Sequence, residues 1–208
     1  MTGVLETEGL PPGQSADATT QSRRLFMVLS PRSLPYARLA LTSLYAKCAE
    51  PFSLVLITDG TDDVRQLRHE LDALAHDPGQ PSRSASVCGE ADLADLEQDR
   101  FGRYQALRHF RHGHPCWRKI TDPLLLSNDH DEMIVLDPDL YFPNRFRFED
   151  TPTRGLALMW QRPSCLLPDE VVAAAIGAGI SLAHHTDIGV SQWRAPVDLE
   201  WLDWLLQQ

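Results

Sequence analysis

Residues 133–139 have the sequence Met-Ile-Val-Leu-Asp-Pro-Asp. Four consecutive apolar residues of this kind are typical of a β-strand that is buried on both faces. Asp137 and Asp139 follow directly, so we expect both carboxylates just beyond the carboxyl end of that strand. In open α/β sheets this edge is where ligands bind. The segment therefore predicts a buried strand and the position of a binding site.

Two earlier apolar runs have the same character. Residues 25–29 and 54–57 are each predicted to be buried strands. Between them, apolar residues recur at positions 37, 41, 44 and 48, which is one face of a helix that ends before Pro51. A strand, a helix and a second strand in close succession form the pattern of a right-handed unit with parallel strands. This part of the chain therefore indicates an α/β fold.

The alternation of helices and strands continues along the rest of the chain. A helix is expected within residues 117–127, with Asp122 as its cap and Pro123 as its first helical residue. The last predicted helix, at residues 199–207, is amphipathic and Trp-rich, so it needs a packing surface, a partner or a second copy of the chain. The other expected elements are a helix through 64–74, a short strand at 86–88, a charged helical region at 90–112, a strand at 156–160, a helix at 169–179 and a strand at 188–193.

Length and composition favour one globular α/β domain. The chain has 208 residues, 43% of them hydrophobic, which suffices for one core of ordinary size. Its formal charge of −10 disfavours nonspecific binding to nucleic acid. The four cysteines lie far apart without a Cys-x-x-Cys pair, so neither a zinc knuckle nor a disulfide framework is indicated. A reducing, cytoplasmic location is the simplest expectation.

The first 24 residues differ in composition from the rest. They are rich in Gly, Pro, Thr, Ser and Gln and contain no apolar core of a signal peptide, so residues 1–24 are predicted to be a disordered tail and residues 25–208 the folded domain. No apolar stretch approaches the roughly 20 residues that span a bilayer. We therefore do not expect an integral membrane protein.

The carboxylate pair that follows residue 136 is the strongest candidate for a metal site. A second Asp-x-Asp triplet, Asp129 and Asp131, lies in a predicted turn where carboxylates are usually just solvated. Asp137 and Asp139 instead stand between apolar segments, and burial makes adjacent carboxylates costly unless a cation neutralises them. Mg²⁺ or Mn²⁺ binds carboxylate and phosphate oxygens and stabilises charge on a departing diphosphate.

With these motifs the sequence resembles the GT-A fold glycosyltransferases, a group of nucleotide-diphospho-sugar transferases, and most closely their glycogenin and bacterial galactosyltransferase-like members. The likeness rests on residues 26–30 with the following helix, 57–60, 133–139 and 185–190. It implies a single Rossmann-like GT-A domain with a mostly parallel central sheet flanked by helices. It also implies a metal-dependent enzyme that moves a sugar from a nucleoside diphosphate sugar to a hydroxyl of a glycan, lipid or protein acceptor.

The resemblance assigns roles to individual residues. Asp137 and Asp139 would bind the metal and the ribose, and Asp187, the catalytic candidate, would line the sugar site together with Gly189. The group also has a basic residue before its Asp-x-Asp motif that contacts the donor, and two adjacent residues are candidates for it. The candidates for this basic residue are Arg118 and Lys119. Ser30 would contact the nucleotide. Asp59 lies on the same edge and is a further donor-site candidate, although a turn residue of this kind needs no ligand to explain it.

The chain also departs from the pattern of the group. Members usually supply a third metal ligand, a histidine, from a segment near the C-terminus, and this chain ends too early for it. His184 and His185 are substitutes only in principle, because such residues are more often on the surface. A truncated fragment, with the domain incomplete at its C-terminus, a minimal enzyme and an inactive relative all fit the short chain.

Other functions were weighed against this one. A phosphatase of the haloacid dehalogenase type also has Asp-x-Asp after a strand, but there the motif ends the first strand. A noncatalytic protein that binds a partner through the Trp-rich helix is a third hypothesis. His109, His112 and His114 fit a charged helix end better than a metal site, and no phosphate-binding glycine loop or nucleophile elbow is present.

Overall fold

The computed structural model describes residues 22–74, 82–160, 169–181 and 186–208. Most of the predicted tail, at residues 1–21, lies outside these ranges, as do Cys165, His184 and His185. Within the described residues, no helix is long and apolar enough to cross a membrane.

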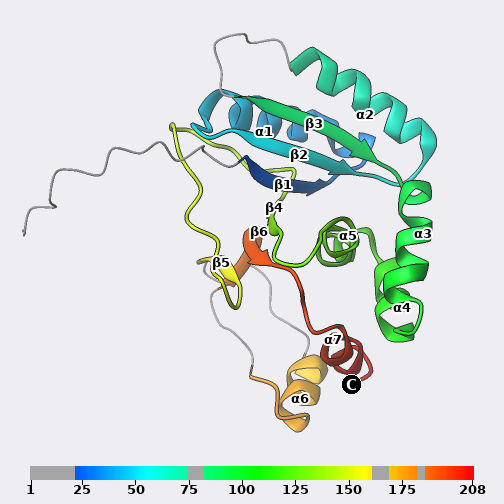
Figure 1. Ribbon diagram of the computed structural model, residues 1–208. Helices are drawn as coiled ribbons and strands as arrows, with labels where there is room; N and C mark the ends of the chain where they lie inside the picture. The colour runs from blue at the N-terminus through cyan, green and yellow to red at the C-terminus, as the bar shows by residue number, and fades with distance from the viewer. Residues whose placement is uncertain (1–21, 75–81, 161–168, 182–185) are drawn as a thin grey trace, which may run out of the picture.

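The centre of the molecule is a six-stranded mixed sheet in the order β3-β2-β1-β4-β6-β5 (Figure 1). The first four strands in this order run parallel to one another, β6 runs antiparallel to β4, and β5 runs antiparallel to β6. The parallel strands follow from the crossover helices between them. The strand bounds are β1 Arg23–Val28, β2 Phe52–Ile57, β3 Arg83–Cys88, β4 Glu132–Leu136, β5 Ala157–Trp160 and β6 Thr186–Arg194.

Helices cover both faces of the sheet, because alternate strand residues point to opposite faces and both sets are apolar. On one face α1 (Leu34–Lys47) and α2 (Thr61–Leu74) pack on side chains such as Met27, Leu56 and Leu136 (Figure 1). On the other face, Phe26 and Val135 contact a core formed with α3 (Glu90–Phe101), α4 (Gln105–Gly113), α5 (Arg118–Leu126) and α7 (Leu199–Leu205). The predicted α/β class with a mostly parallel sheet between helices is confirmed.

The C-terminal helix finds part of its packing surface within the chain. Leu199 and Leu202 pack against the second core, and a carboxylate oxygen of Asp203 accepts a hydrogen bond of 2.9 Å from the amide of Leu107 in α4. Trp201 and Trp204 remain 50% and 42% exposed. The apolar face of leucines is therefore covered, whereas the two tryptophans are not.

Two expectations about helices need correction. The charged region 90–112 forms two helices, α3 and α4, separated at residues 102–104. The helix after it begins at Arg118, directly behind a short 3-10 turn at Pro115–Trp117, so Pro123 lies inside α5 and not at its start. Asp122 is accordingly not a helix cap. Its carboxylate is fully buried and forms ion pairs with Arg111 and Arg118. These ion pairs explain how a buried aspartate is accommodated in the interior of the helix.

Candidate functional site

One edge of the sheet collects most of the residues that the sequence singled out. Ser30, Asp59 and Asp137 follow the carboxyl ends of the parallel strands β1, β2 and β4. Asp187 lies at the beginning of β6, and because β6 is antiparallel to β4, its beginning lies at the same edge. The four strands are consecutive neighbours in the order β2-β1-β4-β6. The structure thus places these four side chains along one continuous edge.

One backbone hydrogen bond joins the Asp-x-Asp segment to the Asp-x-Gly segment, and a second hydrogen bond lies within the Asp-x-Gly segment. The amide of Asp137 donates to the carbonyl of Gly189 at 2.8 Å. The amide of Gly189 in turn donates to Oδ1 of Asp187 at 2.5 Å. A Cβ atom added at Gly189, inside β6, would lie 2.9 Å from that same carboxylate oxygen, so any other residue here would require the Asp187 side chain to shift. The three residues therefore form one connected unit.

Lys119 provides the counter-charge of the first carboxylate. Its Nζ lies 2.5 Å from Oδ1 of Asp137, and the two side chains are 13% and 23% exposed. Oδ1 is buried, and it makes no hydrogen bond to the part of the chain that the structure describes. Asp139 is exposed. The first carboxylate of the motif is thus held inside the edge by an ion pair, and the second faces solvent.

Arg118 points to a different strand from Lys119. Its Nε donates to Oδ2 of Asp122 at 2.7 Å, Nη2 donates to the carbonyl of Thr58 at 3.2 Å, and Nη1 pairs with Asp59. The side chain is 7% exposed, whereas that of Asp59 is 54% exposed. The guanidinium therefore ties α5 to the end of β2 and holds Asp59 at the edge of the sheet.

A buried charge network stands behind Arg118, and the sequence did not reveal it. Arg111 of α4 donates from Nε to Asp122 at 2.8 Å and from Nη1 to Glu97 of α3 at 2.6 Å. Glu97 also accepts hydrogen bonds from Arg108 and contacts His112. Burial raises the pKa of the Glu97 carboxyl, but the hydrogen bonds from His112 and Arg108 and the charge of Arg111 outweigh burial, and the net pKa is lowered. The network keeps its charges paired, as buried charges require.

The remaining donor-site candidate, Ser30, precedes the 3-10 turn η1 (Pro31–Ser33). Its hydroxyl lies 3.4 Å from that of Ser33. Directly after β2, the hydroxyl oxygen of Thr58 is buried and makes no hydrogen bond within the described residues. Atoms of this kind are often satisfied by a ligand or ion.

The residues present suit a hard divalent ion that shares its ligands with a substrate. No group of three His, Cys, Asp or Glu side chains able to hold a metal occurs among the described residues. Mg²⁺ is commonly held by one or two carboxylates together with substrate phosphates, however, and Asp137 and Asp139 offer such a pair. The histidines around residue 112 form no metal centre, since His112 pairs with Glu97 and Glu90.

Comparison with known proteins supports the fold. No protein-family model matches the chain. No curated protein sequence matches it either. Among solved structures, the crystal structure of mouse xyloside xylosyltransferase 1 in its apo form is similar, with a TM-score of 0.54 and 13% sequence identity over 90% of this chain and 71% of that chain. At this identity the likeness concerns the fold alone. The chain therefore has a glycosyltransferase-like fold, as the resemblance implied, and the particular group within it stays a prediction.

Proposed function

We propose that the protein transfers a sugar from a nucleoside diphosphate sugar to an acceptor hydroxyl, with Mn²⁺ or Mg²⁺ at Asp137 and Asp139. One observation carries this proposal. The Asp-x-Asp segment after β4 and the Asp-x-Gly segment at the start of β6 are joined through the hydrogen bond from the amide of Asp137 to the carbonyl of Gly189. The two segments that carry Asp137, which we assign to the metal, and Asp187, which we assign to the sugar, are thereby joined at the edge where open α/β sheets bind ligands.

Charge at the site suits a diphosphate in an otherwise acidic chain. With a net charge of −10, the protein attracts a phosphate only through locally placed cations. Lys119 lies beside Asp137, and its ammonium is the group that we assign to a diphosphate oxygen. Arg118 is already bonded to Asp122 and Thr58, so its role is to hold Asp59 beside Ser30 for the nucleotide.

The carboxylate of Asp187 is suited to a substrate hydroxyl. Its Oδ1 accepts the amide of Gly189, which fixes the direction of the side chain. We assign the second oxygen to a hydroxyl of the donor sugar or of the acceptor. In this role Asp187 orients the reacting hydroxyl and accepts its hydrogen bond.

The metal would be held by Asp137 and Asp139 together with phosphate oxygens of the donor. When bound, it supplies positive charge that stabilises the departing diphosphate. Lys119 then remains as a second positive charge next to Asp137.

A thermal-shift screen against uridine, guanosine and thymidine diphosphate sugars, with and without Mn²⁺, tests the proposal. We expect a rise in Tm that needs both donor and metal and that is lost in Asp137→Asn/Asp139→Asn. Asp129→Asn is the matched control, since Asp129 is an exposed carboxylate of the other Asp-x-Asp triplet. Release of nucleoside diphosphate in the presence of an acceptor then measures turnover.

The same screen distinguishes the alternatives. No rise in Tm with any of the three donors, with or without metal, would favour a noncatalytic role, in which the exposed Trp201 and Trp204 contact a partner. Trapping of an acyl phosphate on Asp137 would favour a phosphatase. A donor-dependent shift that survives chelation of all divalent ions would leave the transferase proposal standing and remove the metal from it.

A further inference from the structure

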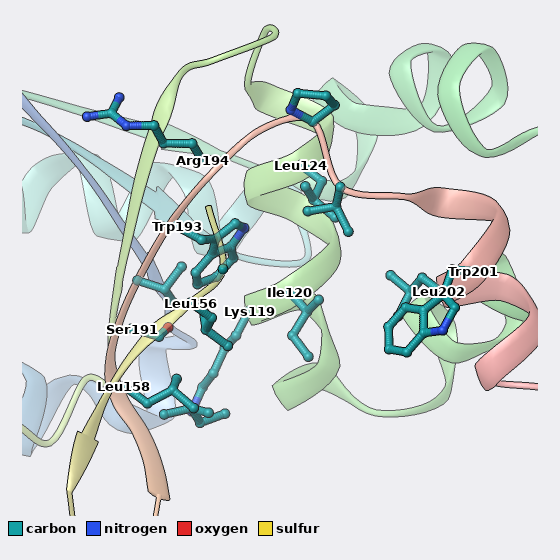
Figure 2. Close-up of a pocket in the computed structure, with 15 residues that line it drawn as sticks. Lys119, Ile120, Leu124, Leu156, Leu158, Ser191, Trp193, Arg194, Trp201 and Leu202 are labelled. Atoms are coloured by element: carbon teal, nitrogen blue, oxygen red, sulfur yellow. The ribbon is translucent and has the colours of Figure 1, made fainter. Parts of the chain in front are cut away.

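A cavity of about 460 Å³ lies beside the proposed donor site (Figure 2). Its walls come from α5, from the end of the sheet at β4, β5 and β6, and from α7. The volume is in the range of small-molecule sites in proteins. The apolar side chains that form most of its surface include Ile120, Leu156, Leu158, Ile188, Trp193 and Trp201.

The cavity shares Lys119 with the carboxylate edge. Lys119 lines it, and the same ammonium pairs with Asp137 at 2.5 Å. Figure 2 shows the Lys119 side chain extending from α5 toward Leu158. Ile188, another lining residue, stands between Asp187 and Gly189 in the chain. A molecule in the cavity therefore has one end next to the residues that we assign to the reacting sugar.

The described residues that line the cavity are mostly apolar. Its charged or hydroxyl side chains are Lys119, Ser191 and Arg194, and no carboxylate or amide side chain is among the described lining residues. The guanidinium of Arg194 donates to the carbonyl of His130 at 3.2 Å, and Figure 2 shows it pointing away from the cavity. Sugar hydroxyls buried here would lack hydrogen-bond partners, which is costly. The walls match an apolar body instead.

The rim of the cavity carries exposed apolar side chains that a ligand can contact from solvent. Leu156 and Ile188 are 53% and 45% exposed, and Trp201 is 50% exposed. An apolar ligand that covers these side chains gains roughly 25 cal/mol for each Å² of apolar surface removed from water. Aromatic side chains such as Trp193 and Trp201 add favourable ring contacts.

From these observations we infer that the cavity binds the apolar body of the acceptor, an alcohol or phenol whose hydroxyl is directed toward Lys119 and Asp187. This inference rests on the proposed transferase function, and it names the acceptor class. The occupant is a small amphiphilic molecule with one polar end, since, among the described lining residues, Lys119 is the charged group that the cavity shares with the carboxylate edge.

Saturation-transfer NMR on the full chain, without donor or metal, tests the cavity itself. The probes are 2-naphthylmethanol and 1-hexanol as apolar alcohols, with methyl β-glucoside as the polar comparison. We expect binding of the apolar alcohols, little binding of the glucoside, and a Kd about tenfold weaker in Trp201→Ala, which corresponds to 1.4 kcal/mol. Leu156→Asn, at a second exposed rim position, is expected to act in the same direction.

Trp204→Ala is the matched control, because Trp204 is on the same helix, is 42% exposed and does not line the cavity. It is expected to bind the probes like the native chain. Equal binding by the native chain, Trp201→Ala and Leu156→Asn would overturn the inference, as would tighter binding of the glucoside. So would self-association, measured by ultracentrifugation, that Trp201→Ala abolishes and the apolar alcohols do not displace.

A transfer assay separates this inference from the proposed function. With a donor that stabilises the chain, a sugar should appear on 2-naphthylmethanol, and Trp201→Ala should raise its KM while the donor KM stays unchanged. Binding of the alcohols without any donor binding would defeat the transferase proposal and, with it, the role of the cavity as an acceptor site. Donor turnover without alcohol binding would defeat the inference alone.

Discussion

The ammonium of Lys119 lies 2.5 Å from Oδ1 of Asp137, and this pair connects helix α5 to the end of strand β4. It places a positive charge beside Asp137, the partly buried carboxylate of the motif, whereas Asp139 is exposed. The pair also gives the two neighbouring basic residues of α5 separate roles, because Arg118 is bonded to Asp122, Asp59 and Thr58.

Replacing Lys119 by Met should weaken donor binding. The change removes the cation that we assign to the diphosphate and leaves the carboxylate of Asp137 without its partner. We expect the Kd for a nucleoside diphosphate with Mn²⁺ to rise about tenfold by calorimetry, close to the strength of one charge-assisted hydrogen bond. Lys47→Met, which changes the chain's other lysine at the end of α1, is the control. Equal affinities for both variants would remove Lys119 from the donor site.

Replacing Glu97 by Gln should destabilise the protein at neutral pH. Glu97 is 6% exposed and pairs with Arg111, which is itself buried, so the substitution leaves a buried guanidinium with one carboxylate partner fewer. Removing one member of a buried pair costs about 3 kcal/mol. Chemical denaturation at neutral pH measures this loss, with Glu200→Gln as the exposed control, since Glu200 is 75% exposed in its pair with Arg103.

The loss of stability caused by Glu97→Gln should depend on pH. The folded-state pKa of Glu97 is lowered from 4.5, so its contribution is fully present above that unfolded value and is lost as the pH falls through the lower folded pKa. The difference in the free energy of unfolding between the native chain and Glu97→Gln should therefore shrink in acid below about pH 4. A difference that stays constant as the pH falls well below about 4 would contradict the ion-pair role.

Replacing Gly189 by Ala should impair the site more than the fold. An added Cβ would meet Oδ1 of Asp187 at 2.9 Å and thereby disturb the unit formed with Asp137. We expect loss of the donor-dependent thermal shift, with about 1 kcal/mol or less lost from the free energy of unfolding. Gly177→Ala, at the end of α6 (Asp169–Gly177) with nothing within 4 Å of the added atom, should keep the donor shift. Unchanged donor binding in Gly189→Ala would contradict the close approach.

The described cysteines should differ in reactivity. Burial, with smaller contributions from Asp92 and Asp122, raises the pKa of the Cys88 thiol to about 11, so little thiolate forms there at about pH 8. Cys116 is exposed. Alkylation with iodoacetamide followed by peptide mapping should modify Cys116 well before Cys88. Faster modification of Cys88 would show that the end of β3 is open to solvent.

The sequence alone predicted the strands and the edge of the sheet. The apolar runs before Ser30, Asp59 and Asp137 are β1, β2 and β4, because short uninterrupted apolar segments that end in turn residues are typical of strands buried on both faces. Strands joined by helical crossovers are parallel, so the residues after them had to meet at one edge. The position of the candidate site follows from these local patterns.

Only the tertiary structure decided which side chains meet at that edge. Successive residues on a helix point about 100° apart, so Arg118 and Lys119 reach different strands, a distinction that depends on how α5 packs on the sheet. The contact between Asp137 and Gly189 required β6 to enter the sheet antiparallel to β4, a non-local pairing. Asp122, expected as a helix cap, became the partner of Arg111 and Arg118 because the packing of α4 and α5 buries it. Sequence periodicity specifies which face of an element is buried, whereas the choice of partner across that face depends on the relative placement of distant segments.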